Sequence, residues 1–108
     1  MVISLAGEWD VYRAQELRER LEPAYTQREV VLDLTSAKYV TSSLISALVI
    51  AHKHRRERRL PPFALAVRSA FVKRLFAVTG IDAMLPIYDS IERAESSFEE
   101  LQPRNAVG

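Results

Sequence analysis

The sequence predicts a single α/β domain with one mixed, mostly parallel sheet of about four strands and about four helices. Short apolar segments alternate along the chain with longer segments in which apolar residues recur at helical spacing, an order typical of strands connected by packed helices. The 108 residues fit one domain with a modest core. We expect residues 1–102 to form the domain and residues 103–108 to form a flexible tail.

Four short apolar segments are the predicted strands, over residues 2–6, 30–34, 63–67 and 85–88. The segment 30–34, V-V-L-D-L, begins with β-branched residues, as a buried strand often does. Residues 7–10 form a turn-like break after the first strand, and Ser36 and Lys38 indicate a loop after the second. In such sheets sites gather at the carboxyl ends of strands. Residues 41–43 lie just beyond one such end and residues 7–10 beyond another, so we expect these two loops to share a surface.

Four helices are expected, over about residues 11–25, 42–56 and 70–78, and from Asp89 or Ser90 to about residue 101. Asp10 and Ser69 are candidate caps of the first and third helices, because their side chains accept hydrogen bonds from free N–H groups. Pro23 leaves the end of the first helix open. Gly80 suits the left-handed position that ends the third.

A cluster of three hydroxyls, Thr41, Ser42 and Ser43, stands where the second helix should begin. Small hydroxyl residues favour this position as helix caps. The positive end of a helix also tolerates a phosphate. The residues alone leave both interpretations open.

The second helix has two further features. Apolar residues cover nearly every direction around its axis over residues 44–51, which indicates either deep burial or an apolar patch for a partner. Residues 52–59, H-K-H-R-R-E-R-R, form the one basic run. We interpret this run as a solvated helix end whose cations complement the helix dipole, rather than as a nucleic-acid patch.

Composition and missing motifs argue against several functions. A net charge of +1 gives no general attraction to nucleic acid or membrane, and the absence of cysteine fits a cytoplasmic protein without disulfides. We expect neither a signal peptide nor a membrane span. Glycine-rich phosphate loops and a nucleophile elbow are lacking, and His52 and His54 are spaced poorly for a metal. We therefore expect no catalysis, no cofactor and no metal.

Five segments in order carry a family resemblance. They are G-E-W-D at 7–10, V-L-D-L-T at 31–35, T-S-S-L at 41–44, V-K-R-L-F-A-V-T-G at 72–80 and L-P-I-Y-D-S-I-E-R-A at 85–94. Together they resemble the STAS domains, most closely the bacterial anti-sigma factor antagonists, over about residues 3–98. The resemblance implies a STAS-like fold, with the family's D-S-S-G motif falling on residues 41–44.

The resemblance also implies a function. Members of that family bind an anti-sigma factor that is a serine kinase, and phosphorylation of the first serine of the motif ends the complex. By position Ser42 is the expected phosphoacceptor, ahead of Thr41 and Ser43. The expected partner-binding residues are Asp10, Thr41, Ser43, Leu44 and Ala47. A homodimer is possible.

Two residues depart from the family motif. Thr41 stands in place of aspartate and removes a charge, and Leu44 stands in place of glycine. A partner with an apolar pocket would gain from that leucine, whereas one that needs the glycine would clash. The alternative function is therefore an unphosphorylated STAS scaffold subunit in a transporter or a stress-signalling assembly.

Overall fold

The computed structural model of the protein describes residues 1–9 and 11–101. The cap predicted at Asp10 and the tail predicted over residues 103–108 lie outside the described residues.

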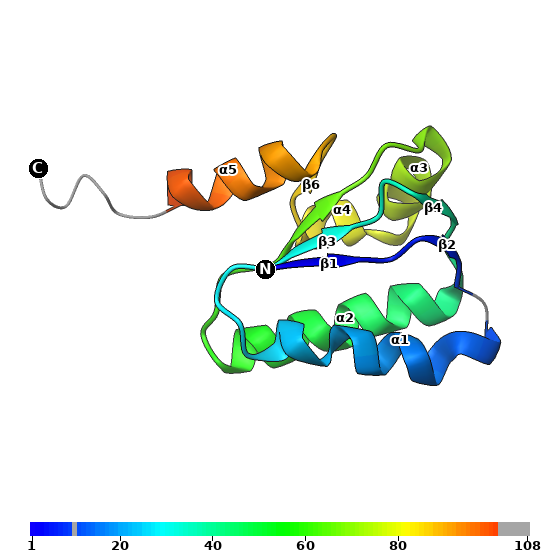
Figure 1. Cartoon of the computed structure of the whole chain (residues 1–108), viewed down its shortest axis with the longest axis horizontal. Coiled ribbons are helices and arrows are strands. Elements are labelled where there is room, and N and C mark those ends of the chain that lie inside the picture. The colour runs from blue at the N-terminus through cyan, green and yellow to red at the C-terminus, as the bar shows by residue number, and fades with distance from the viewer. Residues whose placement is uncertain (10, 102–108) are drawn as a thin grey trace, which may run out of the picture.

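A four-stranded parallel sheet forms the centre of the molecule (Figure 1). Its order is β1 (Val2–Ser4), β3 (Val31–Asp33), β5 (Ala64–Ala66) and β6 (Ile87–Tyr88). The register aligns Ile3 with Leu32, Leu32 with Leu65 and Leu65 with Ile87. The predicted α/β class and the four strands are confirmed, and every pairing in this sheet is parallel rather than mixed.

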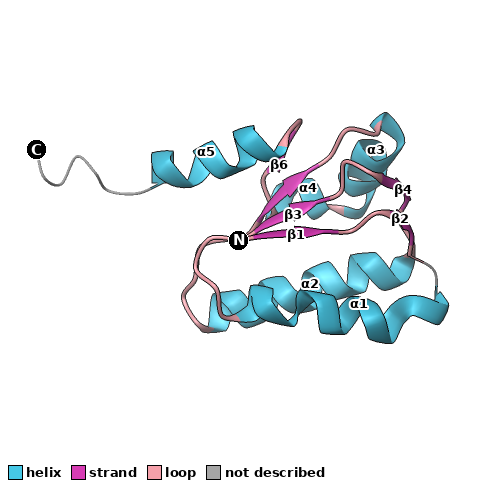
Figure 2. Cartoon of the chain, in the orientation of Figure 1, coloured by secondary structure: helices cyan, strands magenta, loops and turns pink. Residues whose placement is uncertain are grey.

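Helices cover both faces of this sheet (Figure 2). α1 (Ala14–Leu21) and α2 (Ser42–Glu57) pack with Leu32 and Leu65 in the larger core. α5 (Ile91–Leu101) packs on Val31, Ala64 and Ala66 through Ala94 and Phe98. Alternate residues of a strand point to opposite faces, so Val31 and Leu32 serve different layers.

Predicted caps appear at three helix ends. Ser69 Oγ accepts a hydrogen bond from Val72 N at 3.2 Å at the start of α3 (Ala70–Thr79), and Gly80 ends that helix with φ +83°. Ser90 Oγ accepts from Arg93 N at 3.1 Å before α5. Of the two caps proposed for this helix, Ser90 is therefore the one used, while Asp89 accepts from Lys73 Nζ at 2.7 Å instead.

The first predicted helix is divided into three pieces. A 3₁₀ turn, Val11–Arg13, precedes α1, and a second one, Glu22–Tyr25, follows it. Pro23 lies in the first turn of that second piece, where its missing N–H costs no hydrogen bond. The sequence also failed to predict the short helix α4 (Ile81–Met84) and two very short strands, β2 (Gly7–Glu8) and β4 (Ala37–Tyr39).

The basic run contains one arginine that the predicted solvated helix end does not explain. Arg55 is fully buried, whereas Arg56, Arg58 and Arg59 are exposed. Its guanidinium donates to the carbonyl oxygens of four residues at 2.6 to 2.9 Å, namely Ala24, Gln27, Arg28 and Pro61. Arg55 therefore ties the end of α2 to the segment after α1 and to the loop before β5.

Among the described residues, no helix is long and apolar enough to cross a bilayer.

Candidate functional site

The two loops predicted to share a surface do meet. β2 and β4 pair in parallel, and Gly7 N donates to Ser36 O at 3.0 Å. Just after these two strands, Thr41 Oγ1 donates to the carbonyl oxygen of Trp9 at 2.5 Å. The start of α2 is thus fixed against the loop that follows β2.

Thr41 is the residue that precedes α2, in an extended conformation (φ −102°, ψ 170°). Its side chain makes no capping hydrogen bond, because the hydroxyl is turned to Trp9 instead. The cap interpretation is therefore wrong for the Thr41 side chain. Its backbone carbonyl accepts the hydrogen bond of Ile45 N at 3.1 Å, which begins the helix.

The three hydroxyls differ in exposure and in bonding. Ser42 is exposed, whereas Thr41 and Ser43 are half-buried. Within the described residues neither serine hydroxyl has a hydrogen-bond partner, while that of Thr41 has one. Ser42 therefore presents the most accessible nucleophilic oxygen of the cluster. Asp10, which was expected beside it, lies outside the described residues.

Leu44 occupies a position different from the one expected, whereas Ala47, although buried, lines the groove described below. Leu44 is fully buried and Ala47 is 7 % exposed, both within the larger core. Leu44 therefore offers no side-chain surface to a partner, and the expected clash or apolar pocket at this residue does not arise. The leucine fills core volume where glycine would leave a cavity.

The apolar side chains of α2 divide between the core and the surface. Leu44, Leu48 and Ala51 face the core, whereas Val49 and Ile50 are 39 % and 43 % exposed. The deep-burial and apolar-patch interpretations each describe part of this helix.

An open groove runs between α1 and α2 beside the hydroxyl cluster. Its volume is about 200 Å³. Its lining comes from both helices and consists of Ala14, Arg18, Ser42, Ser43, Ser46, Ala47 and Ile50. The site is thus a hydroxyl-rich groove that also contains the Arg18 cation and the exposed apolar side chain of Ile50.

Trp9 lies buried beneath this surface, and its role there was not predicted from the sequence. Its side chain is 1 % exposed, and the Arg13 guanidinium lies 3.8 Å from the ring centroid in cation–π contact. Arg13 in turn forms an ion pair with Glu16 at 3.1 Å. The sequence shows a tryptophan between two acidic residues in the loop segment G-E-W-D at 7–10. This pattern alone does not predict burial, because the burial of a loop aromatic depends on contacts distant in sequence.

Asp33 stabilises the turn after β3, which precedes the hydroxyl cluster in the sequence. Its carboxylate accepts from Thr35 N at 3.0 Å, from Thr35 Oγ1 at 2.6 Å and from Ser4 Oγ at 3.0 Å. Desolvation raises the pKa of Asp33, but the hydrogen bonds from Thr35 and Ser4 together outweigh it and lower that pKa below its usual value.

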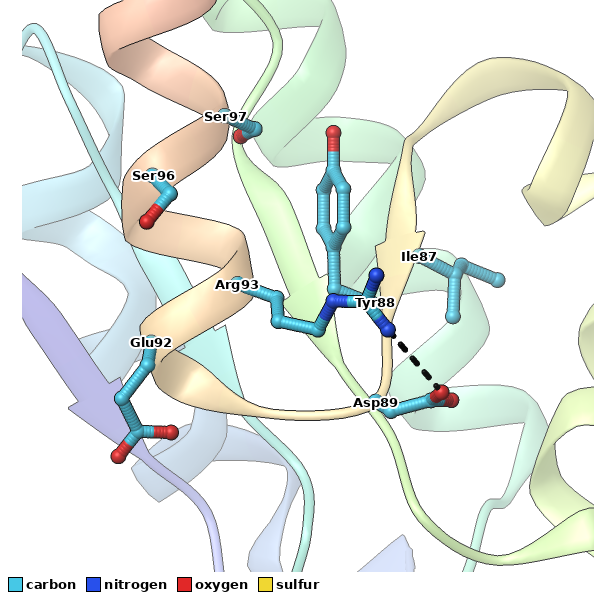
Figure 3. Close-up of a pocket in the computed structure, with 7 residues that line it drawn as sticks. All are labelled: Ile87, Tyr88, Asp89, Glu92, Arg93, Ser96 and Ser97. Carbon is cyan, nitrogen blue, oxygen red and sulfur yellow. Dashed lines mark ion pairs between the residues drawn. The ribbon is translucent and has the colours of Figure 1, made fainter.

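A second groove, of about 590 Å³, lies between β6 and α5 (Figure 3). Its lining includes Tyr88, Asp89 and Arg93, which belong to the segment 85–94 of the family resemblance, and Ser96 and Ser97, which follow that segment. The charges of this groove pair locally, since Asp89 lies 2.7 Å from Lys73 and 3.9 Å from Arg93. It is separate from the Ser42 surface, because α5 packs on the opposite face of the sheet.

His52 and His54, whose spacing argued against a metal site, lie away from the hydroxyl cluster, in the later turns of α2. The His54 ring stacks on Tyr25, with ring centroids 4.3 Å apart. The pKa of His52 is lowered mainly by its burial, and also by the nearby charges of Arg56 and Arg55. Across the described residues, no group of three or more metal-ligating side chains gathers.

Comparisons with known proteins agree with this architecture. Anti-sigma-B factor antagonists of Listeria monocytogenes and Listeria innocua are each 36 % identical over 89 residues, which is 79 % of this chain and 75 % of theirs. A crystal structure of an anti-sigma factor antagonist from Mycobacterium paratuberculosis superposes with a TM-score of 0.75 at 23 % identity, covering 89 % of this chain and 82 % of that one. The anti-sigma factor antagonist SpoIIAA, solved in its unphosphorylated form, gives a TM-score of 0.67 at 16 % identity, with 94 % and 88 % coverage. These two structures share the fold.

A protein-family model gives the same assignment. Residues 1–86 match the model described as "Mlab, STAS domain". With the parallel sheet, the hydroxyl cluster before α2 and the curated relatives, this match shows that the chain belongs to the STAS domain family.

Proposed function

We propose that this domain is an anti-sigma factor antagonist, whose surface around Ser42 binds an anti-sigma factor with serine kinase activity. The exposed hydroxyl of Ser42 is the observation that carries the proposal, because it is the accessible oxygen of the cluster at the position where the family motif falls. The names of the curated relatives support the antagonist function. The solved neighbour in an unphosphorylated form supports a phosphorylation cycle.

Phosphorylation would act as a switch at this surface. The Ser42 oxygen attacks the γ-phosphorus of ATP in the partner, the bond from that phosphorus to the bridging oxygen breaks, and ADP leaves while the hydroxyl proton passes to a base of the kinase. The new group adds about −1.5 to −2 charges at neutral pH. Because Ser42 is exposed, the group causes no burial cost within the domain, and its effect falls on the complex through desolvation or repulsion.

The experiment is an incubation of the full chain with Mg-ATP and the ATP-binding anti-sigma factor encoded in the same genome, followed by peptide mass mapping. Phosphate on Ser42 that disappears in the Ser42→Ala variant supports the proposal. Phosphate on Ser43 or Thr41 instead would correct the acceptor. A complex without any phosphate transfer would overturn the switch.

The second candidate function is a constitutive, unphosphorylated STAS scaffold subunit. Thr41 favours it, because this residue fixes the loop to Trp9 by a neutral hydrogen bond where the family motif has a charged aspartate. Co-purification of the chain with the same partners from cells, at equal yield for wild type and Ser42→Asp, would favour the scaffold over the switch.

A further inference from the structure

The two helices that form the groove beside Ser42 lie side by side and begin at the same end of the molecule (Figure 1). The Thr41 hydroxyl contacts Trp9, just before α1, at one end of α2, and Arg55 contacts Ala24, just after α1, at the other. An advance of four residues moves about 6 Å along a helix axis. Arg18 of α1 and Ser46 of α2, one turn past Ala14 and Ser42, line the same groove as those two residues.

The Arg18 side chain turns back toward the start of both helices. Its Nη2 donates to Oε1 of Gln15 at 2.9 Å, and Gln15 lies three residues earlier on α1. This is the direction that helical side chains favour. Arg18 lines the same cavity as Ser42 and Ser43.

Arg18 has no acidic partner in the part of the chain that the structure describes. Arg13 and Arg93 form ion pairs with carboxylates, whereas the contact of Arg18 is with the neutral amide of Gln15. Gln15 in turn donates to Glu19 at 3.2 Å, so the amide links the arginine to that acid. The groove therefore contains an exposed guanidinium whose charge no carboxylate of residues 1–9 or 11–101 matches by contact.

We propose that Arg18 is a positioning residue that receives the phosphate of phospho-Ser42 and holds it in the groove between α1 and α2. This proposal rests on Ser42 as the phosphoacceptor. A guanidinium matches a phosphate with two parallel N–H···O bonds, and the pair is stronger than one between neutral groups. Arg18 would exchange its bond to neutral Gln15 for a charged one. The phosphorylated groove would then differ from the free one in shape as well as in charge.

The test places phosphoserine at position 42 of the full chain by codon suppression, so that it needs no kinase. The phosphate is titrated by phosphorus NMR in the wild-type background, in Arg18→Gln, and in Arg28→Gln as the matched control. The backbone carbonyl of Arg28 accepts from Arg55, at the far end of α2, so its side chain starts far from Ser42. An adjacent cation favours the charged form of the phosphate.

The expected result is a second phosphate pKa that lies about half a unit or more lower in the wild-type background than in Arg18→Gln. The Arg28→Gln background should titrate as wild type, and Arg18→Lys should fall between. Equal titration of wild type and Arg18→Gln would overturn the role of Arg18. Because the phosphate is installed directly, a failed kinase assay would count against the proposed function and would leave this result standing.

Discussion

The Thr41 hydroxyl donates to the Trp9 carbonyl oxygen at 2.5 Å, across 32 positions of sequence. This bond joins the residue before α2 to the loop after β2, and so connects the two segments that frame Ser42. Thr41, which stands where the family motif has aspartate, therefore fixes this loop through a neutral group. The sole tryptophan of the chain lies at this contact and can report on it.

Thr41→Val should weaken this junction. The variant keeps the shape of the side chain and removes the donor, so we expect the free energy of unfolding to fall by about 0.5–1.5 kcal/mol. The tryptophan emission of the folded state should shift as well. Urea unfolding followed by fluorescence measures both. Ser42→Ala, which removes an exposed hydroxyl, is the control and should change stability by less than about 0.5 kcal/mol.

Leu44→Ala should destabilise the fold strongly, because Leu44 is fully buried. A buried leucine truncated to alanine typically costs about 2–5 kcal/mol. Leu44→Gly, which restores the family residue, should cost about 1 kcal/mol more through helix propensity. Ile50→Ala on the exposed side of the same helix is the comparison. Equal denaturation midpoints for Leu44→Ala and Ile50→Ala would show that Leu44 is not a core residue.

Arg55→Lys should destabilise the protein although it keeps the charge. Lysine has three donors on one nitrogen and cannot reach four carbonyl oxygens that the planar guanidinium contacts together. We expect a loss of about 3 kcal/mol or more, measured by chemical denaturation. Arg56→Lys, at the neighbouring exposed position, should stay within about 0.5 kcal/mol of wild type. Similar stability for both variants would refute the role of Arg55.

The Asp33 carboxylate should make stability depend on pH in the acid range. Its pKa is lowered in the folded protein from an ordinary 3.8, so its contribution is present above that value and is lost as pH falls through the lower folded pKa. Asp33→Asn should cost about 1–3 kcal/mol at pH 7, and the gap to wild type should shrink below pH 4 or so. Thr35→Val, which removes the 2.6 Å donor, should reduce this pH dependence in part. A gap that stays constant with pH would exclude Asp33 as its source.

Local sequence patterns predicted much of the fold, because the relevant interactions are local. The β-branched start of β3, the caps at Ser69 and Ser90 and the glycine at position 80 act within a few residues. β2 and β4 escaped prediction, since Gly-Glu and Ala-Lys-Tyr do not form the apolar runs that mark the other four strands.

The buried face of α2 could be predicted from the sequence, but the hydrogen-bond partners of Arg55 could not. Residues 44, 48, 51 and 55 recur at helical spacing and are all buried. This periodicity could have placed Leu44 in the core and Arg55 on the same stripe. The carbonyl groups that satisfy Arg55 come from residues 24–28 and 61, however, and no pattern in the sequence brings them together. The Trp9 contact of Thr41 was hidden for the same reason.

The affinity for the anti-sigma factor of the same genome tests the central claim most directly. Isothermal titration calorimetry should compare wild type with Ser42→Ala, Ser42→Asp and Ser96→Asp, the last adding the same charge on the exposed surface of α5. We predict that Ser42→Asp raises Kd by about tenfold or more, which is about 1.4 kcal/mol, at a nearly unchanged melting temperature. Ser42→Ala and Ser96→Asp should bind as wild type does. A Ser42→Asp variant that binds as tightly as wild type would contradict the account.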